Sequence, residues 1–166
     1  MFLSTVDTEV GGLTVVADGA GALRAAGFGP ADALLARLGG PAPERRDHLG
    51  RVTQALRAYF DGDLQALDDL AATQDGGPFL RRAWKIMREV PAGETVTYTE
   101  LAARAGSPTA VRAAGQACAR NLIAPVVPCH RVLRSDGTLG GYAYGLPVKR
   151  WLLDHESGCR WSPRFA

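Results

Sequence analysis

The chain has 166 residues, of which 46% are hydrophobic and 22% are charged, and its formal net charge is +2. This length can hold one ordinary domain or two small ones with a buried core, and no apolar run approaches the ~18 residues of a membrane span. Because the first residues reach Asp7 without a basic segment, no signal peptide is predicted, and we expect a cytoplasmic protein.

The charge is unevenly distributed along the chain. Residues 1–78 contain 6 Lys/Arg and 11 Asp/Glu, a net charge of −5, whereas residues 79–166 contain 13 and 6, a net charge of +7. A basic half joined to an acidic half is typical of a protein whose basic part meets a polyanion. A solvated surface without a partner explains the same pattern, so charge alone leaves both interpretations open.

The cysteines form an odd set, Cys118, Cys129 and Cys159, which favours reduced thiols over a disulfide framework. A structural zinc site needs about four Cys/His ligands, usually with a C-x2-C pair, and the sequence contains no such pair. Neither a metal nor another cofactor is therefore predicted.

The first half of the chain has the pattern of a small α/β unit. Short strands are predicted at 13–16 and 23–28, between glycine-containing turns. A helix is predicted over 30–38, and a second helix has one apolar face formed by Leu49, Val52, Leu56 and Phe60. Residues 71–78 have the composition of a linker. We therefore expect an α/β supporting domain over 1–75 and a second domain over 79–166.

The second half begins with an amphipathic helix over 79–90. Thr97 and Glu100 then form a capping-box pattern, which predicts a helix over about 98–105 that ends at Gly106. Ser107 and Pro108 are typical of the start of another helix, over about 108–120.

Two short helices around a glycine-containing turn indicate a helix-turn-helix, whose second helix can enter a DNA groove. On that second helix Arg112, Gln116 and Arg120 share one face because they are four residues apart. A solvated polar face gives the same spacing, so periodicity alone does not decide between the two.

After Asn121 the chain becomes apolar and β-branched, which predicts a buried extended segment leading to Cys129, His130 and Arg131. A turn is predicted at 135–137. The last predicted helix spans about 147–156, with one side formed by Val148, Trp151, Leu152 and His155.

Cys129 and His130 are a candidate nucleophile and base. The thiolate is the reactive form of cysteine, and a base or a positive field must generate it at neutral pH. Neighbouring side chains of a strand point to opposite faces, so the pair needs a tight turn or a bridging water, unlike a papain-like protease. A buried, inert cysteine beside an exposed histidine is the alternative.

The wider pattern resembles the O6-alkylguanine-DNA alkyltransferases, the methylated-DNA–protein-cysteine methyltransferases. The resemblance covers residues 79–156. It rests on the segments Tyr98–Ala102, Arg112–Gly115, Pro128–Val132, Gly141-Tyr142 and Lys149–Glu156, together with Asn121. The spacing is also similar, with Arg112 placed 17 residues before the cysteine and Glu156 placed 27 residues after it. An α/β N-terminal domain and a mainly helical C-terminal domain with a winged helix-turn-helix are implied.

The resemblance also implies the role of each catalytic residue. Cys129 would accept the alkyl group, and His130 would act as its base through a water molecule, oriented by Glu156. Asn121 would tie the helix-turn-helix to the active-site turn. Tyr98 would face the departing guanine and help to protonate it.

Further residues are implied in binding DNA and the flipped base. Arg112 would enter the duplex where the damaged nucleotide leaves, with Ala113, Gly115, Gln116 and Tyr98 also on the DNA-binding surface. The substrate pocket would be formed by Tyr142, Ala143, Tyr144 and backbone groups near Val132.

The implied activity is direct-reversal repair with a single turnover, because the product thioether is not readily hydrolysed. The partner would be double-stranded DNA with an alkylated base, approached from the minor groove by a monomer. O6-alkylguanine is the expected substrate, and O4-alkylthymine is left open as a second one. Base extrusion costs a few kcal/mol, and an inserted arginine offsets part of the lost stacking.

Three positions depart from the family's usual pattern. Leu122 stands where proline is common, which predicts a less tightly held hinge. Ala143 replaces a frequent serine and Tyr144 a common glycine, which leaves the preference for small or bulky alkyl groups open. If the Tyr144 ring pointed into the pocket it would narrow it, and otherwise it would face solvent or DNA.

Other classes of protein remain as alternatives. A non-catalytic protein that binds alkylated bases would typically have tryptophan in place of Cys129. A helix-turn-helix transcription factor would need base-reading residues and usually a dimer interface. A fused methyl-sensing regulator would need an additional zinc domain with more cysteines.

Overall fold

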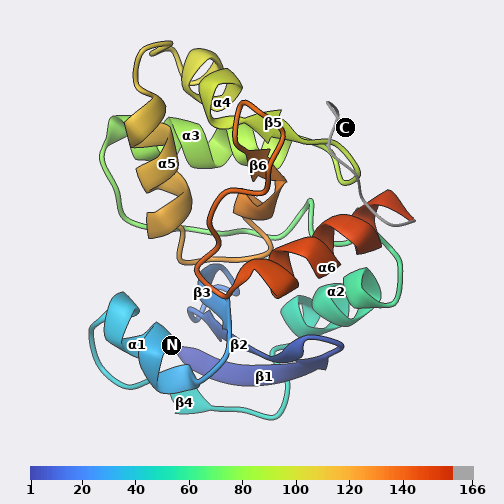
Figure 1. The fold of residues 1–166 in the computed structure, drawn as a ribbon. Helices are drawn as coiled ribbons and strands as arrows, with labels where there is room; N and C mark the ends of the chain where they lie inside the picture. The colour runs from blue at the N-terminus through green and yellow to red at the C-terminus, as the bar shows by residue number, and fades with distance from the viewer. Residues whose placement is uncertain (159–166) are drawn as a thin grey trace. The chain divides into compact units, whose positions relative to one another are not determined.

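The computed structural model describes residues 1–158. It divides into two compact units, the first made of residues 1–74 and 122–126 and the second of residues 75–121 and 127 onward (Figure 1). The short segment 122–126, which the sequence-based boundary assigns to the C-terminal domain, therefore belongs to the first unit. Cys159 lies outside the described residues.

The first unit is built on a four-stranded sheet with strand order β3-β2-β1-β4. Strands β1 (Phe2–Thr8), β2 (Gly11–Ala17) and β3 (Leu23–Phe28) pair antiparallel, and the two-residue strand β4 (Glu44–Arg45) pairs parallel with β1. The predicted strands at 13–16 and 23–28 correspond to β2 and β3. Strand β1 was not predicted, because polar residues interrupt its apolar alternation.

Two helices bury their apolar faces in this unit. Helix α1 (Ala31–Leu38) contributes Leu34 to a core that includes Leu3, Val16 and Ala25. Helix α2 (Arg51–Phe60) buries three of the four residues of the predicted face, with Val52, Leu56 and Phe60 below 7% exposure, whereas Leu49 lies before the helix and is partly buried.

Residues 122–126 bind along strand β3. The Ala26 N–H donates to the Leu122 carbonyl at 2.8 Å, and the Ala124 N–H donates to the Ala26 carbonyl at 3.0 Å. The Leu122 N–H also donates to Gln74 Oε1 at 2.9 Å. A proline at position 122 has no N–H and could not make this last bond, so the leucine supplies a connection of its own to the preceding linker.

The second unit contains most of the helices. They are α3 (Pro78–Glu89), α4 (Tyr98–Arg104), α5 (Val111–Arg120), the short 3₁₀ helix η1 (Cys129–Arg131) and α6 (Leu146–Ser157). Strands β5 (Val96–Thr97) and β6 (Val132–Leu133) form a parallel pair, with Val96 opposite Val132. This pairing places the start of α4 beside the segment that follows Cys129.

The start of α4 confirms the predicted cap, because Thr97 Oγ1 accepts the Glu100 N–H at 3.0 Å. The predicted start of the next helix at 108 was wrong, since α5 begins at Val111. Residues 107–110 instead form a turn closed by the Ala110 N–H and the Ser107 carbonyl at 2.9 Å.

The buried face of α6 also differs from the prediction. It consists of Lys149, Leu152, Leu153 and Glu156, whereas the predicted face combined Leu152 with residues that are only partly buried. Trp151 and His155 stack on each other with ring centroids 4.7 Å apart. The spacing of apolar residues failed here because two of the buried side chains are charged.

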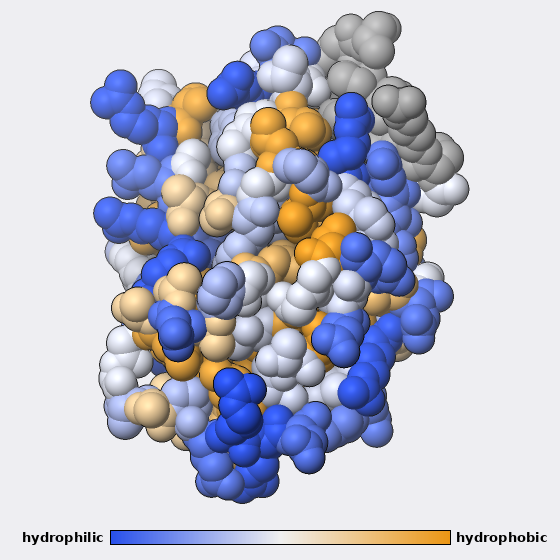
Figure 2. All heavy atoms as spheres, turned by 60° about the horizontal axis from the view of Figure 1, so that its bottom comes forward, coloured by the Kyte–Doolittle hydropathy of each residue, from blue (hydrophilic) through white to orange (hydrophobic). Residues whose placement is uncertain are grey.

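No helix within residues 1–158 is both long and apolar enough to cross a membrane. On the face shown in Figure 2, hydrophobic residues form small groups between hydrophilic ones. Across the described residues, the large hydrophobic side chains that remain exposed are Met1, Val111 and Leu146.

Candidate active site

A pocket of about 380 Å³ lies within the second unit. Its walls come from the start of α4, one face of α5, the η1 turn and the loop before α6. The lining residues are Tyr98, Gly115, Cys118, Ala119, Cys129, Gly141, Tyr142 and Ala143. Most of these side chains are small, so the pocket has room for a flat ring.

Cys129 is the first residue of η1 and is 7% exposed. The turn is closed by the Cys129 N–H donating to the Val127 carbonyl at 2.9 Å and the Arg131 N–H donating to the Pro128 carbonyl at 3.0 Å. Cys129 and His130 thus lie in a tight turn and not in a strand, where neighbouring side chains point to opposite faces. Strand β6 begins directly after this turn and anchors it.

His130 is fully buried and shares a hydrogen bond of 2.9 Å between its Nε2 and Glu156 Oε2. Arg131 binds the same carboxylate with two donors, Nε to Oε1 at 2.8 Å and Nη2 to Oε2 at 2.8 Å. Its third donor, Nη1, binds the Val90 carbonyl at 2.6 Å. The carboxylate is thus bound by both residues that follow the cysteine.

These contacts determine which nitrogen of His130 carries the proton. An ionised carboxylate only accepts hydrogen bonds, so Nε2 must be the donor to Glu156. In a neutral imidazole the other nitrogen, Nδ1, then has a free lone pair. Nδ1 is buried and has no hydrogen-bond partner among the described residues, which leaves it available as a proton acceptor.

The electrostatics favour a neutral histidine and an ionised glutamate. Burial lowers the pKa of His130, Glu156 opposes this shift, and the charges of Arg131 and Lys149 add to it, so the pKa is lowered overall. Burial raises the pKa of Glu156, but His130 and Arg131 together outweigh burial and hold that pKa well below its usual range. At neutral pH the imidazole is therefore a base, oriented by a carboxylate.

Asn121 connects the end of α5 to the segment before the cysteine. It is 2% exposed, it is the C-terminal cap of α5, and its Nδ2 donates to the Val127 carbonyl at 2.7 Å. The Val127 carbonyl also accepts the Cys129 N–H. One carbonyl thus joins the helix end to the nucleophile turn.

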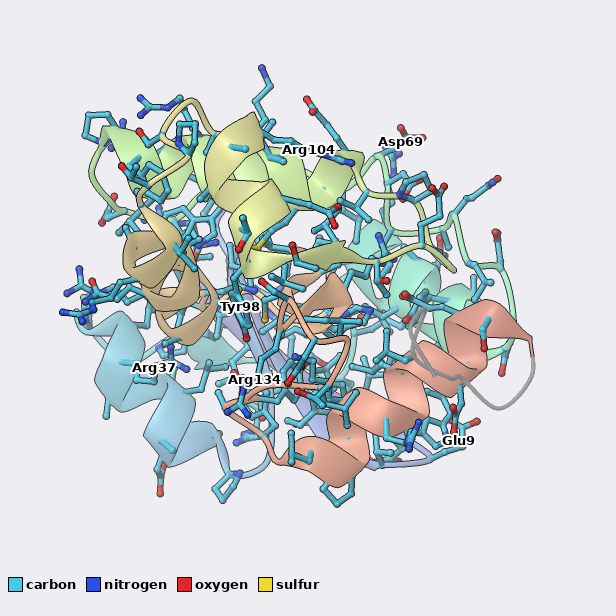
Figure 3. The ribbon with its side chains drawn as sticks, turned by 45° about the horizontal axis from the view of Figure 1, so that its top comes forward. Glu9, Arg37, Asp69, Tyr98, Arg104 and Arg134 are labelled. Carbon is cyan, nitrogen blue, oxygen red and sulfur yellow. The ribbon has the colours of Figure 1, made fainter. Side chains whose placement is uncertain are left out.

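Tyr98 lines the pocket from the first turn of α4. Burial raises the pKa of Tyr98 to about 12, the charges of Cys118 and Cys129 add to this shift, and Arg134 opposes it. Figure 3 shows Tyr98 and Arg134 between α4 and α6. Gly140 lies against both, since a Cβ there would be 2.9 Å from Tyr98 Oη and 3.5 Å from Arg134 Cγ.

Tyr142 and Ala143 line the pocket, but two other predicted pocket residues do not. Val132 is fully buried in β6, and Tyr144 packs edge-on against Tyr142 with ring centroids 5.6 Å apart. Neither belongs to the described lining. Tyr144 thus contacts a residue of the pocket wall, and its role in the preference for small or bulky alkyl groups stays a prediction.

Of the predicted DNA-binding residues, Tyr98 is the first residue of α4 and the other four lie on α5. Arg112 and Gln116 are exposed, whereas Ala113 and Gly115 are partly buried. Gly115 also lines the pocket. The helix thus has one face for solvent and another for the pocket.

Sequence reasoning missed three residues of the site. Arg131 and Lys149 are buried cations in hydrogen-bond networks, and Cys118 lines the pocket beside Cys129. Burial raises the pKa of Cys118. At neutral pH Cys118 is therefore a thiol, which is less reactive than a thiolate. A signal for Lys149 exists in the sequence, because it lies seven residues, about two turns, before Glu156.

Within residues 1–158, no group of three or more His, Cys, Asp or Glu side chains is placed to hold a metal ion.

The chain is similar to several known proteins. Residues 78–158 match the family described as "6-O-methylguanine DNA methyltransferase, DNA binding domain". The methylated-DNA–protein-cysteine methyltransferase of Shigella flexneri is 46% identical over 107 residues, which are 64% of this chain and 63% of that protein. The protein of the same name from Methanosarcina mazei is 47% identical over 113 residues, 68% of this chain and 71% of that protein.

A solved structure is similar along nearly the whole chain. The crystal structure of Mycobacterium tuberculosis OGT in complex with DNA has a TM-score of 0.82 and 32% identity, covering 95% of this chain and 94% of that one. The small N-terminal sheet followed by helices is thus a shared architecture. By contrast, the match to the Shigella protein spans less than two thirds of that protein's length.

Proposed function

Because the chain belongs to the methylated-DNA–protein-cysteine methyltransferase family, we propose that it repairs O6-alkylguanine in DNA by irreversible transfer of the alkyl group to Cys129. The observation that carries this proposal is the buried Cys129 at a pocket, followed by a buried His130 whose Nε2 is hydrogen-bonded to Glu156 and whose Nδ1 has no hydrogen-bond partner among the described residues. Activity on O4-alkylthymine is not required by this arrangement.

The first step is removal of the Cys129 proton. His130 Nδ1 accepts it through a water molecule, and the resulting imidazolium is stabilised by the Glu156 carboxylate at Nε2. This assignment makes His130 the base and Glu156 the group that orients it.

The thiolate then attacks the alkyl carbon. A C–S bond forms, the C–O6 bond breaks, and its electron pair moves into the guanine ring system. The Tyr98 hydroxyl stays protonated, with a pKa of about 12, and donates a hydrogen bond to the departing base as negative charge develops on it. The base takes up one proton, and the proton that Cys129 gave to His130 balances it. The products are unmodified guanine and an S-alkylcysteine, which does not regenerate the thiol.

For the DNA complex, we infer that α4 and α5 form a winged helix-turn-helix that enters the minor groove as a monomer. The exposed Arg112 and Gln116 on α5 support a DNA-facing helix. The target must leave the duplex to reach a buried thiol, and Arg112 would fill the space it vacates. A groove that distinguishes bases poorly suits a protein that searches any sequence.

The test is intact-protein and peptide mass spectrometry after incubation with a duplex containing O6-methylguanine. We expect one methyl group per protein, on the peptide containing Cys129 and not on those containing Cys118 or Cys159, and no transfer to Cys129→Ser. Multiple turnovers, or methylation of Cys118, would refute the assignment. A protein that binds the lesion without gaining mass would be a non-catalytic damage binder instead.

A further inference from the structure

Lys149, on helix α6, is a charged side chain with no exposed surface. Its ammonium donates to the Val132 carbonyl at 2.8 Å, to the Gly141 carbonyl at 3.2 Å and to the Leu139 carbonyl. An ammonium has three donors and no acceptor. Its hydrogen-bonding capacity is therefore used entirely on the backbone of two segments.

Those two segments are both parts of the pocket. Val132 is the first residue of β6, directly after the η1 turn that carries Cys129. Leu139 and Gly141 belong to the loop before α6, in which Gly141, Tyr142 and Ala143 line the pocket. Lys149 thus connects the segment that follows Cys129 to the loop that forms another part of the pocket wall.

The electrostatic cost of this position indicates that the contacts matter. Burial lowers the pKa of Lys149, the charges of Cys129 and Cys118 raise it, and Arg134 lowers it. In the described part of the chain, no carboxylate pairs with its ammonium. Lysine is among the residues that are almost never fully buried without a partner, so the three carbonyls are what holds it there.

Helix α6 also supplies the carboxylate that orients the base. Lys149 and Glu156 are seven residues apart, about two helical turns, and both belong to the buried face. The same rigid helix therefore fixes His130 through Glu156 and fixes the pocket loop through Lys149.

We propose that Lys149 is a positioning residue for alkyl transfer, whose ammonium clamps the loop at residues 139–141 to Val132 and so sets the spacing between the pocket wall and Cys129. The expected effect of Lys149 on the kinetics of alkyl transfer rests on the proposed function. The clamp itself is a structural property that can be measured without any reaction.

The test compares Lys149→Met, which keeps the length of the side chain but removes every donor, with Lys85→Met as a matched control. Lys85 is an exposed lysine on α3 of the same unit. Hydrogen exchange followed by mass spectrometry reports the opening of each segment. In Lys149→Met we expect amides of residues 138–143 to exchange at least about tenfold faster, with those of α3 and α5 unchanged, because opening is local.

The kinetic arm uses free O6-benzylguanine under single-turnover conditions. We expect the half-saturating concentration to rise at least about tenfold in Lys149→Met, since displacement of a pocket wall weakens substrate placement. Binding to undamaged duplex DNA and all properties of Lys85→Met should stay at the wild-type level. A purely structural lysine would instead loosen the whole unit and weaken DNA binding as well.

Each outcome is decisive for one of the two proposals. If the wild-type protein gains no alkyl group, the proposed function fails, while the exchange data still test the clamp. The clamp proposal would be overturned if amide exchange at residues 138–143 were the same in Lys149→Met as in the wild type, or if exchange increased equally in α3, α5 and the loop. If Lys149→Met does not fold, Lys149→Gln retains donors for some of the carbonyls and should show an intermediate increase. The inference would also be overturned if the amides of residues 138–143 in the wild-type protein exchanged as fast as those of a free peptide.

Discussion

Replacing Arg131 with Met should destabilise the protein strongly. Arg131 is 6% exposed and donates two hydrogen bonds to the Glu156 carboxylate and one to the Val90 carbonyl. Removing one partner of a buried pair leaves the other charge uncompensated and costs about 3–5 kcal/mol. This is a large part of the roughly 5–15 kcal/mol by which a typical domain is stable.

Urea unfolding followed by intrinsic tryptophan fluorescence measures this loss. The exposed pair Arg46–Glu44 provides the control, because its Nε–Oε1 distance is 3.0 Å but its side chains are 50% and 64% exposed. Arg46→Met should cost at most about 1 kcal/mol. The double variant Arg131→Met/Glu156→Met should be less destabilised than the sum of its single variants, because neither charge is then left alone.

The same substitution should change the pH dependence of alkyl transfer. Without Arg131, one of the charges that lower the pKa of His130 is removed while Glu156 still raises it, so the pKa of His130 should rise. A larger fraction of His130 is then protonated at a given pH and cannot act as a base, so the acid limb of the rate profile should move to higher pH. A loss of stability as small as that of Arg46→Met, or an acid limb that moves to lower pH, would refute this reasoning.

Three further predictions concern other parts of the site. Burial lowers the pKa of His130, so as the pH falls below ~6.5 the histidine gains a proton in the unfolded state but not in the folded state. The free energy of unfolding should therefore decrease by at most about 1.4 kcal/mol per pH unit in this range, and His130→Gln should make it less dependent on pH. Gly140→Ala should slow alkyl transfer, because the new Cβ would lie 2.9 Å from Tyr98 Oη and the backbone has a φ of +70°. Tyr98→Phe removes that hydroxyl, so in a double-mutant cycle Gly140→Ala should slow transfer less in the Tyr98→Phe background. Arg112→Ala should slow repair in duplex DNA much more than reaction with the free base, and equal losses would assign Arg112 to folding.

Much of the fold follows from local sequence rules. The Thr97 cap and the apolar face of α2 were predicted correctly because each depends on residues close in sequence. The late start of α5 and the place of residues 122–126 were not predicted. Both depend on backbone hydrogen bonds, within a turn in one case and with β3 in the other, and side-chain types record such bonds only weakly.

The site was predicted less evenly. The structure brings Cys129, Tyr98 and Tyr142 to one pocket and joins His130 to Glu156, as the resemblance implies. Periodicity could not have placed them together, because α4, η1 and α6 are far apart in the chain. The contributions of Arg131 and Lys149 were missed, since charged residues in a helix or after a turn ordinarily face solvent.

These missed residues bear directly on the reactivity of Cys129. The buried groups around it are two cations, Arg131 and Lys149, one carboxylate, Glu156, and a neutral imidazole. Their charges leave one positive charge uncompensated inside the unit. The charge of Lys149 and the charge of an ionised Cys129 stabilise each other, so this positive charge lowers the electrostatic cost of forming a thiolate in a poorly solvated interior. The buried lysine thus assists formation of the nucleophile, while His130 provides the site to which the proton moves.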